Sequence, residues 1–124
     1  MKTSKIVKSI LKNYESDNTK TLKNLNRIFM TGKLSGTGKL VILPVDQGYE
    51  HGPDRSFAIN PDAYDPHYHF RLAIDAGMSA FAAPLGMIES GVDTFKNKVP
   101  LILKCNSSNS LTKEADQAIT GSVK

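Results

Sequence analysis

The sequence predicts an α/β protein that is built on parallel strands. Three short apolar runs, at residues 40–45, 79–84 and 99–106, have the composition of buried strands, and a helical pattern separates the first two. Strands and helices that alternate in this way favour parallel strands joined by crossover connections. With 124 residues, the chain is long enough for one modest domain with a hydrophobic core.

Two amphipathic helices are expected before the first strand. Apolar residues recur at helical spacing over residues 4–14 and again over 21–30, and Gly32 is a suitable helix stop. Residues 1–40 hold nine lysines and arginines against two acids, and we interpret these charges as the solvated face of the helices. Because no aromatic or Gly-Arg interleaving accompanies them, nucleic acid is not an expected partner. We therefore divide the chain into a helical extension, 1–38, and a main domain, 39–124.

The glycine-rich segment 32–39 has some features of a phosphate-binding loop. Such a loop needs four residues between its first glycine and a Gly-Lys-Ser/Thr sequence, and a helix must follow. Here Gly38 and Lys39 are followed by Leu40 and a predicted strand. We therefore interpret the segment as a flexible turn that leads into the sheet.

The first predicted strand ends in a group of polar residues. Residues 40–45 are almost uniformly apolar, which suits a strand buried on both faces of a parallel sheet. The polar residues that follow it are Asp46, Gln47, Glu50 and His51. Enzymes of the α/β class carry reactive groups at the carboxyl ends of their strands. The alternative is a capped strand end at which Asp46 only accepts hydrogen bonds from loop amides, and the residues alone leave both possibilities open.

The rest of the chain predicts one long helix and several short elements. Asp65 is a hydrogen-bond acceptor at a helix cap, Pro66 suits the first helical position, and Gly77 ends this helix. The remaining expectations are a loop over 56–63, a loop or short helix over 85–94, a polar loop over 107–112 and a short helix over 114–119.

Asp46 and Lys104 form the pair with the greatest chemical potential. Both are predicted at the carboxyl ends of parallel strands, and therefore at the same edge of the sheet. A carboxylate close to an amine can move protons in carbonyl chemistry, because each group tunes the protonation of the other. A structural ion pair at the rim of the sheet is equally compatible with the sequence.

Metal and disulfide chemistry are not expected. His67 and His69 are two residues apart on a predicted helix and point to different sides, so they cannot easily share one ion. The single cysteine, Cys105, excludes an internal disulfide and suits a reducing cytosol. We interpret Cys105 as a small core residue rather than as a nucleophile paired with His51. No apolar run approaches the roughly 20 residues that span a bilayer, so we expect a cytoplasmic protein without a membrane partner.

Several separated motifs occur in a specific order and spacing, at residues 31–38, 42–53, 56–57, 60–61, 72–77, 99–104 and 106–111. Together they resemble the amino-terminal part of the archaeal-type class I fructose-bisphosphate aldolases, and the resemblance runs from about residue 22 to the end. It implies a TIM (β/α)8 barrel. This chain would hold the first three βα units of that barrel, preceded by the helical extension.

The resemblance also implies an activity and roles for individual residues. The activity is the reversible, metal-free cleavage of fructose 1,6-bisphosphate into dihydroxyacetone phosphate and glyceraldehyde 3-phosphate through a lysine Schiff base. Asp46 matches the family's catalytic aspartate, which contacts substrate hydroxyls and assists proton transfer. Gln47 and His51 match residues of the first loop close to the substrate, and Lys104 matches a lysine that supplies positive charge to the mouth. The expected partner is a sugar phosphate; no cofactor is implied, and complete members are expected to be homo-oligomers.

The resemblance places two catalytic residues beyond Lys124. The family's Schiff-base lysine lies on the sixth strand and its proton-donating tyrosine on the fifth, and an eight-fold barrel needs about 200 residues or more. We therefore expect the isolated chain to be inactive. Two alternatives stay open, namely a non-catalytic product of a truncated or split gene that needs a partner, and a related aldolase that acts on another sugar phosphate.

Overall fold

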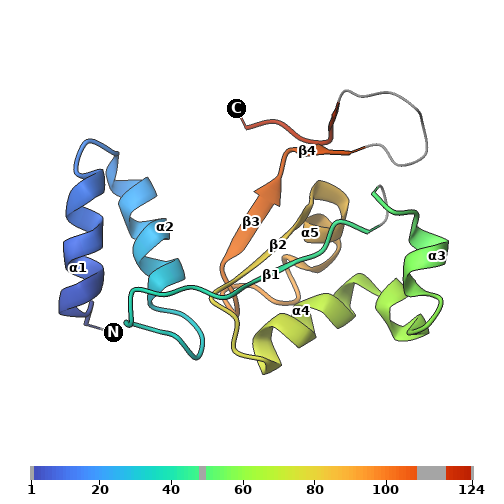
Figure 1. The fold of residues 1–124 in the computed structure, drawn as a ribbon, viewed down its shortest axis with the longest axis horizontal. Coiled ribbons are helices and arrows are strands. Elements are labelled where there is room, and N and C mark those ends of the chain that lie inside the picture. Colours follow the sequence, from blue (N-terminus) through green and yellow to red (C-terminus); the bar gives the residue numbers. More distant parts are fainter. Residues whose placement is uncertain (1, 48–49, 109–116, 124) are drawn as a thin grey trace.

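The computed structural model describes residues 2–47, 50–108 and 117–123, and its centre is a parallel sheet of three strands in the order β1-β2-β3 (Figure 1). The strands are β1, Ile42–Pro44; β2, Ala80–Pro84; and β3, Leu101–Lys104. Phe81 lies opposite Leu43 on one side and opposite Leu101 on the other. The predicted parallel α/β arrangement is therefore confirmed, while the described strands form an open sheet and not a closed barrel.

One face of this sheet carries the hydrophobic core. Helix α4, Pro66–Asp75, follows β1, and helix α5, Leu85–Gly91, follows β2. Phe70 of α4 meets Phe81 of β2 with ring centroids 4.9 Å apart and stacks on Phe95 at 5.0 Å. Since side chains alternate along a strand, Val45, Phe81 and Ala83 face these helices. Asp46 and Lys104 consequently project from the opposite face.

Helix α4 begins and ends where local signals in the sequence place it. The Asp65 side chain accepts a hydrogen bond from the backbone N–H of His67 at 2.9 Å, which caps the helix. Pro66 occupies the first turn. Gly77, with φ of 71°, takes up the left-handed conformation that ends a helix at low cost. The predicted helix is therefore confirmed.

The amino-terminal part is a pair of helices beside the end of the sheet at which the strands begin (Figure 1). Helix α1 is Lys5–Leu11, continued by a 3-10 turn at Lys12–Tyr14, and helix α2 is Thr19–Phe29. Helix α2 starts two residues earlier than predicted because the Asn18 side chain caps it, accepting hydrogen bonds from Lys20 and Thr21 at 3.0 Å. Among the described residues, no helix is both long enough and apolar enough to cross a bilayer.

The turn that follows α2 approaches the end of α4 closely. Lys33 N–H donates to the carbonyl of Gly77 at 2.8 Å. A Cβ atom on Gly32 would lie 2.3 Å from that same carbonyl oxygen, so only glycine fits there. The segment 32–39 is thus a turn, as predicted, and Gly32 permits the close approach of its backbone to the end of α4.

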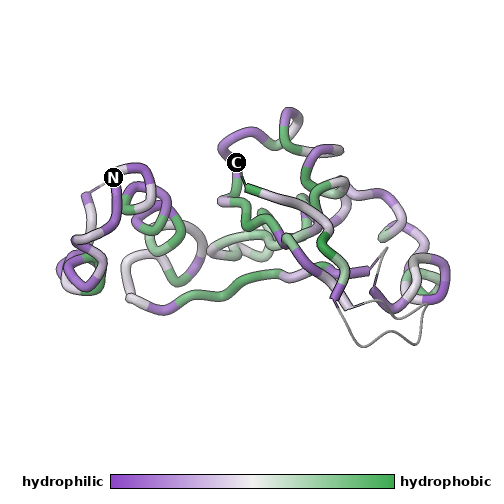
Figure 2. The backbone as a smooth tube through the Cα atoms, turned by 90° about the horizontal axis from the view of Figure 1, so that it is seen from above, coloured by the Kyte–Doolittle hydropathy of each residue, from purple (hydrophilic) through white to green (hydrophobic). Residues whose placement is uncertain are grey.

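The prediction that residues 40–45 form a strand buried on both faces is wrong. Strand β1 covers only Ile42–Pro44, and 38% of Leu40, 38% of Val41 and 37% of Ile42 are exposed. Figure 2 shows this stretch as the green, hydrophobic segment that links the helical pair to the sheet. Among the described strands, β1 pairs only with β2, so its outer side chains lack a neighbouring strand.

The predicted loop over 56–63 contains two helical turns instead. Helix α3 is Pro53–Phe57, and a 3-10 helix covers Pro61–Tyr64. Each starts with a proline, whose fixed φ suits a first helical position. The ring of Phe57 packs edge-on against Tyr64 with centroids 5.7 Å apart, which joins the two turns. The alternative of a short helix over 85–94 is confirmed by α5.

The carboxyl-terminal segment forms a second, small sheet next to the tip of β3. Strand β4, Asn106–Ser107, pairs antiparallel with strand β5, Ala118–Ile119. The predicted helix over 114–119 is therefore wrong at 118–119, and 114–116 lie outside the described residues, as do residues 109–112 of the predicted polar loop. Strand β5 is held beside β4 because the backbone N–H groups of Thr120 and Gly121, just after β5, donate to the carbonyl of Cys105, just before β4, at 2.8 and 3.2 Å.

Candidate active site

Asp46 and Lys104 meet at the carboxyl end of the parallel sheet. Asp46 lies two residues beyond β1, and Lys104 is the last residue of β3. Lys104 Nζ donates a hydrogen bond to Asp46 Oδ1 at 2.6 Å. The Lys104 side chain is 25% exposed and the Asp46 side chain 37%. The structure thus brings together the two residues that the sequence placed at one edge of the sheet.

Glu50 is a second carboxylate on the same lysine. Lys104 Nζ donates to Glu50 Oε2 at 2.7 Å, and the Glu50 side chain is only 17% exposed. Glu50 reaches this position because the loop after β1 turns back on itself, with Glu50 N–H donating to the carbonyl of Asp46 at 3.3 Å. The buried hydroxyl of Ser107, from β4, donates to the same Glu50 Oε2 at 3.0 Å. The loop after β1, strand β3 and strand β4 therefore meet at the carboxylate of Glu50.

The contacts of Glu50 and Lys104 favour the charged forms of these two residues. The hydrogen bond from Lys104, followed by that from Ser107, lowers the pKa of Glu50 below its ordinary value. Partial desolvation pulls the pKa of Lys104 down, but the hydrogen bonds to Asp46 and Glu50 outweigh it and leave that pKa raised. Lys104 is consequently an ammonium ion between two acceptors at neutral pH.

The charge of the cluster limits what it can bind. One ammonium and two carboxylates sum to a net charge of minus one when His51 is neutral. Lys104, which the resemblance gave the role of supplying positive charge to the mouth, has that charge offset by its own neighbours. The cluster is therefore suited to hydroxyl groups and to a developing positive charge, and it is poorly suited to phosphate.

Gln47 and His51 lie next to the cluster but have different surroundings. Gln47 Oε1 accepts a hydrogen bond from the backbone N–H of Asp46 at 3.2 Å, so Gln47 braces the turn after β1. His51 Nε2 lies 3.8 Å from Glu50 Oε1, and 61% of the His51 side chain is exposed. The backbone of His51 has φ of 65°, an unusual value for a residue with a Cβ. His51 therefore stands at the rim of the mouth, within reach of Glu50.

The sequence indicated Glu50 only as one of the polar residues after the first strand, with no assigned role, and it did not single out Ser107. Glu50 stands four residues after Asp46 in the polar stretch, and Ser107 stands three residues after Lys104. Each therefore follows a strand end that had already been singled out. The signal that could have found them is the convergence of polar residues after two neighbouring parallel strands, since such residues share one edge of the sheet.

The two histidines of α4 contact different groups. His67 Nε2 lies 2.8 Å from the carbonyl of Ser90, and His69 Nε2 lies 2.8 Å from the carbonyl of Ala63. Within the described ranges, no group of three or more His, Cys, Asp or Glu is arranged to hold a metal ion. Cys105 is a partly buried free thiol.

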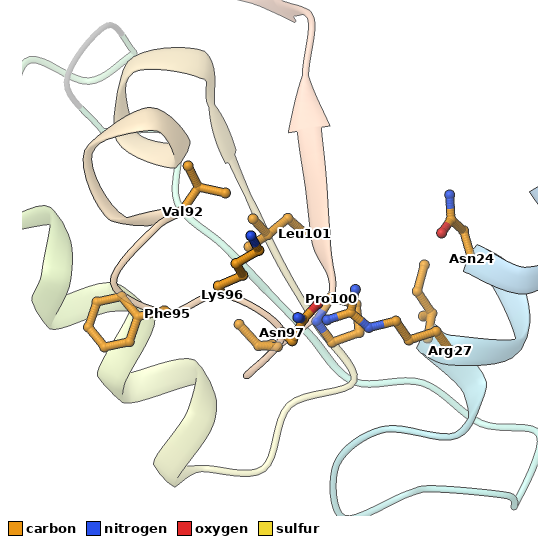
Figure 3. A pocket seen from close by; sticks show the side chains of 10 residues that line it. Asn24, Arg27, Val92, Phe95, Lys96, Asn97, Pro100 and Leu101 are labelled. Carbon is orange, nitrogen blue, oxygen red and sulfur yellow. The ribbon is translucent and has the colours of Figure 1, made fainter. Parts of the chain in front are cut away.

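A cavity of about 270 Å³ lies away from this cluster, between α2 and the segment that leads into β3. Figure 3 shows Arg27 reaching from α2 toward Asn97 and Pro100, with Phe95 on the far wall. The lining contains none of the site residues that the sequence predicted. Because it adjoins the amino end of β3, it lies at the opposite end of the sheet from Asp46 and Lys104.

Comparison with known proteins identifies the family to which the chain belongs. Residues 40–124 match the DeoC/LacD family aldolases. The chain belongs to this family. Among named relatives, it is 44% identical over 99 residues to a Chlamydia trachomatis protein called "Probable fructose-bisphosphate aldolase class 1". It is 46% identical over 74 residues to the "Fructose-bisphosphate aldolase class 1" of Thermoproteus tenax, and 34% identical over 98 residues to that of Halobacterium salinarum.

These aldolase relatives are longer than the chain. The aligned segments cover 79%, 60% and 78% of this chain but only 28%, 27% and 37% of the three relatives, in the same order. The chain therefore spans about a quarter to somewhat over a third of their length. The resemblance to class I fructose-bisphosphate aldolases that the motifs indicated is confirmed. No solved structure matches the chain.

Proposed function

We propose that this chain supplies the first three βα units of a class I fructose-bisphosphate aldolase. The reaction is the reversible cleavage of fructose 1,6-bisphosphate into dihydroxyacetone phosphate and glyceraldehyde 3-phosphate through a lysine Schiff base. Membership of the aldolase family and the names of the relatives support the reaction class. The observation that carries the proposal is the 2.6 Å contact between Asp46 and Lys104 at the carboxyl end of the sheet.

In this proposal Asp46 is the residue that meets the substrate. Its side chain is 37% exposed on the face of the sheet that the core leaves open, and Lys104 holds one of its oxygens. A carboxylate fixed in this way can accept hydrogen bonds from substrate hydroxyls and take part in proton transfer. The contact with Lys104 keeps the Asp46 carboxylate oriented.

The Schiff base forms elsewhere in the proposed enzyme. By resemblance, the lysine that forms it and the tyrosine that donates a proton belong to the sixth and fifth strands of the barrel. Activity on this proposal therefore requires those strands, in a longer chain or in a partner polypeptide. The role of Lys104 in this proposal is to hold the carboxylates of Asp46 and Glu50, to which its Nζ atom donates.

A second candidate is a related aldolase that acts on another sugar phosphate. The family that matches residues 40–124 is described by two aldolase types and not by one substrate. The cluster around Lys104 would serve either substrate, because it would contact the hydroxyl groups next to the reacting carbons, which both substrates carry. Residues that bind the phosphate groups would decide between the two candidates.

A graft tests the proposal. In the Thermoproteus tenax relative, the segment that aligns with this chain is replaced by the corresponding residues of this chain, and cleavage of fructose 1,6-bisphosphate is followed with a coupled assay. We expect a folded graft to cleave this substrate, and Asp46→Asn to reduce kcat/KM by about 100-fold or more. Asp75→Asn, which removes an exposed carboxylate of α4, is the matched control and should keep the activity.

Other outcomes of the graft have distinct meanings. Cleavage of other sugar phosphates in preference to fructose 1,6-bisphosphate would favour the second candidate. A graft that is folded by circular dichroism and size-exclusion chromatography but cleaves no sugar phosphate would contradict the proposal. The isolated chain, assayed in parallel, is expected to be inactive.

A further inference from the structure

Lys104 lies between two carboxylates, and its ammonium group donates a hydrogen bond to each of them. Its Nζ atom is 2.6 Å from Asp46 Oδ1 and 2.7 Å from Glu50 Oε2, distances typical of charge-assisted hydrogen bonds. An amine attacks a carbonyl carbon only with its lone pair, and an ammonium ion has none. The two contacts therefore do more than fix the side chain, since they also hold the nitrogen in its unreactive form.

We propose that Glu50 is a positioning residue which, together with Asp46, prevents Lys104 from acting as a second imine-forming lysine at the carboxyl end of the sheet. We call this effect the mask. The inference deepens the proposed function and rests on it, because a Schiff-base aldolase must direct its carbonyl substrate to one lysine. Lys104 is held at the same mouth as the substrate-contacting Asp46. An unmasked Lys104 would compete for the substrate's carbonyl group.

Glu50 is the more buried of the two masking groups. Its side chain is 17% exposed against 37% for Asp46, so water weakens its contact with Lys104 less. Ser107, which is 1% exposed, donates to the same Glu50 oxygen at 3.0 Å and so keeps it ionised and in place. Among the described residues, His51 is a further titratable group at this contact, and its Nε2 atom lies 3.8 Å from the other oxygen of Glu50.

The chemistry that the mask prevents is ordinary imine formation. The neutral amine of Lys104 would add to a ketone or aldehyde carbon, forming a C–N bond while the carbonyl π electrons move to oxygen. Transfer of the amine protons and loss of water then give the imine. In the masked state the first step fails because the nitrogen's electron pair is held by a proton.

Reductive labelling of the isolated chain tests the mask directly. The chain is incubated at pH 7.5 with dihydroxyacetone as the carbonyl probe and with sodium cyanoborohydride, which supplies the hydride that reduces any imine to a stable amine. Modification of each lysine is then measured by peptide mass mapping, with Lys39 as the exposed internal reference. We expect Lys104 to be modified at least about tenfold more slowly than Lys39, because its nitrogen is held as an ammonium ion by two carboxylates.

Variants at the carboxylates should release Lys104. Glu50→Gln should raise the modification rate of Lys104 by about tenfold, and the double variant Asp46→Asn/Glu50→Gln by about a hundredfold, since each carboxylate removed lowers the pKa of the lysine. Ser107→Ala should have a smaller effect in the same direction. The pH at which modification of Lys104 is half-maximal should fall in the same order, a readout that a purely structural role of Glu50 would not move. Glu89→Gln, at an exposed glutamate of α5, should change neither quantity.

Two results would overturn the inference. One is a wild-type Lys104 that is modified as fast as Lys39. The other is a double variant that keeps the wild-type circular dichroism and melting behaviour but does not increase the modification of Lys104. Neither result depends on sugar cleavage, so failure of the graft and failure of the mask are separate outcomes.

Discussion

Lys104 and Glu50 are 54 residues apart in the chain, yet Lys104 Nζ donates a hydrogen bond to Glu50 Oε2 at 2.7 Å. The contact joins the end of β3 to the loop after β1, across the intervening strand β2. It therefore links two outer strands of the described sheet at the edge where the candidate active site lies. Stability and site geometry consequently depend on the same ammonium group.

Replacement of Lys104 should destabilise the fold. Lys104→Met leaves Asp46 and Glu50 close together without a cation, and we expect a loss of about 1–2 kcal/mol in the free energy of unfolding, between the values for exposed ion pairs and for buried charged hydrogen bonds. Urea denaturation followed by circular dichroism measures it. Lys98→Met, at an exposed lysine before β3, is the control and should change the midpoint little. Equal midpoints for the two variants would show that the cluster contributes nothing to stability.

Acid should weaken the fold through Glu50. The pKa of Glu50 is lowered in the folded chain, chiefly by the hydrogen bond from Lys104. Its stabilising contribution is therefore present above the ordinary glutamate pKa and is lost as the pH falls through the lowered value. The raised pKa of Lys104 acts at the other end of the scale, where stability should fall as the pH rises through that raised value.

Unfolding free energies measured from pH 7 down to pH 3 for the wild type and for Glu50→Gln test this dependence. The difference in stability between the two proteins should shrink as the pH decreases, because protonation removes the charge that the substitution has already removed. A difference that stays constant over this range would assign the acid sensitivity to other carboxylates.

Gly91 should be irreplaceable at the back of the core. A Cβ atom there would lie 2.4 Å from the ring of Phe70, which is fully buried and stacked on Phe95. Gly91→Ala should therefore cost about 1–3 kcal/mol of stability through overpacking. Gly86→Ala is the matched control in the same helix, because nothing lies within 4 Å of its added Cβ. If thermal melts of the two variants coincide, the packing of α5 against Phe70 is not as described.

The parts of the fold that the sequence predicts are those that local chemistry determines. Asp65, Pro66 and Gly77 each act within one turn of the helix that they delimit, so the limits of α4 follow from neighbouring residues. The parallel strands follow from the order of apolar runs. The exposure of Ile42 could not be predicted from its residue type, because branched apolar residues are usually buried in parallel sheets. Whether this residue is buried depends on whether another strand pairs with the outer edge of β1.

The candidate site also contains residues that the sequence predicts and residues that it does not. Asp46 and Lys104 could be predicted because each ends an apolar strand, and parallel strands end at one edge. Glu50 and Ser107 could not be assigned, because their roles depend on how the loop after β1 and strand β4 fold over that edge. The pairing of β4 with Ala118–Ile119 is likewise non-local and has no signature in so short a segment.

The last prediction concerns Gly32, at which the glycine-rich turn approaches the backbone at the end of α4. Gly32 and Gly36 have similar positive φ values, 80° and 77°, so an alanine at either position pays the same left-handed penalty of about 1 kcal/mol. Only at Gly32 would the new Cβ collide with the carbonyl of Gly77, at 2.3 Å; at Gly36 the nearest atom is an ordinary 3.5 Å away. Gly32→Ala should therefore be more destabilising than Gly36→Ala by a further 1–3 kcal/mol or so. Urea midpoints of the two variants provide the comparison, and equal losses would mean that the helical pair is not held against the end of α4 by this contact.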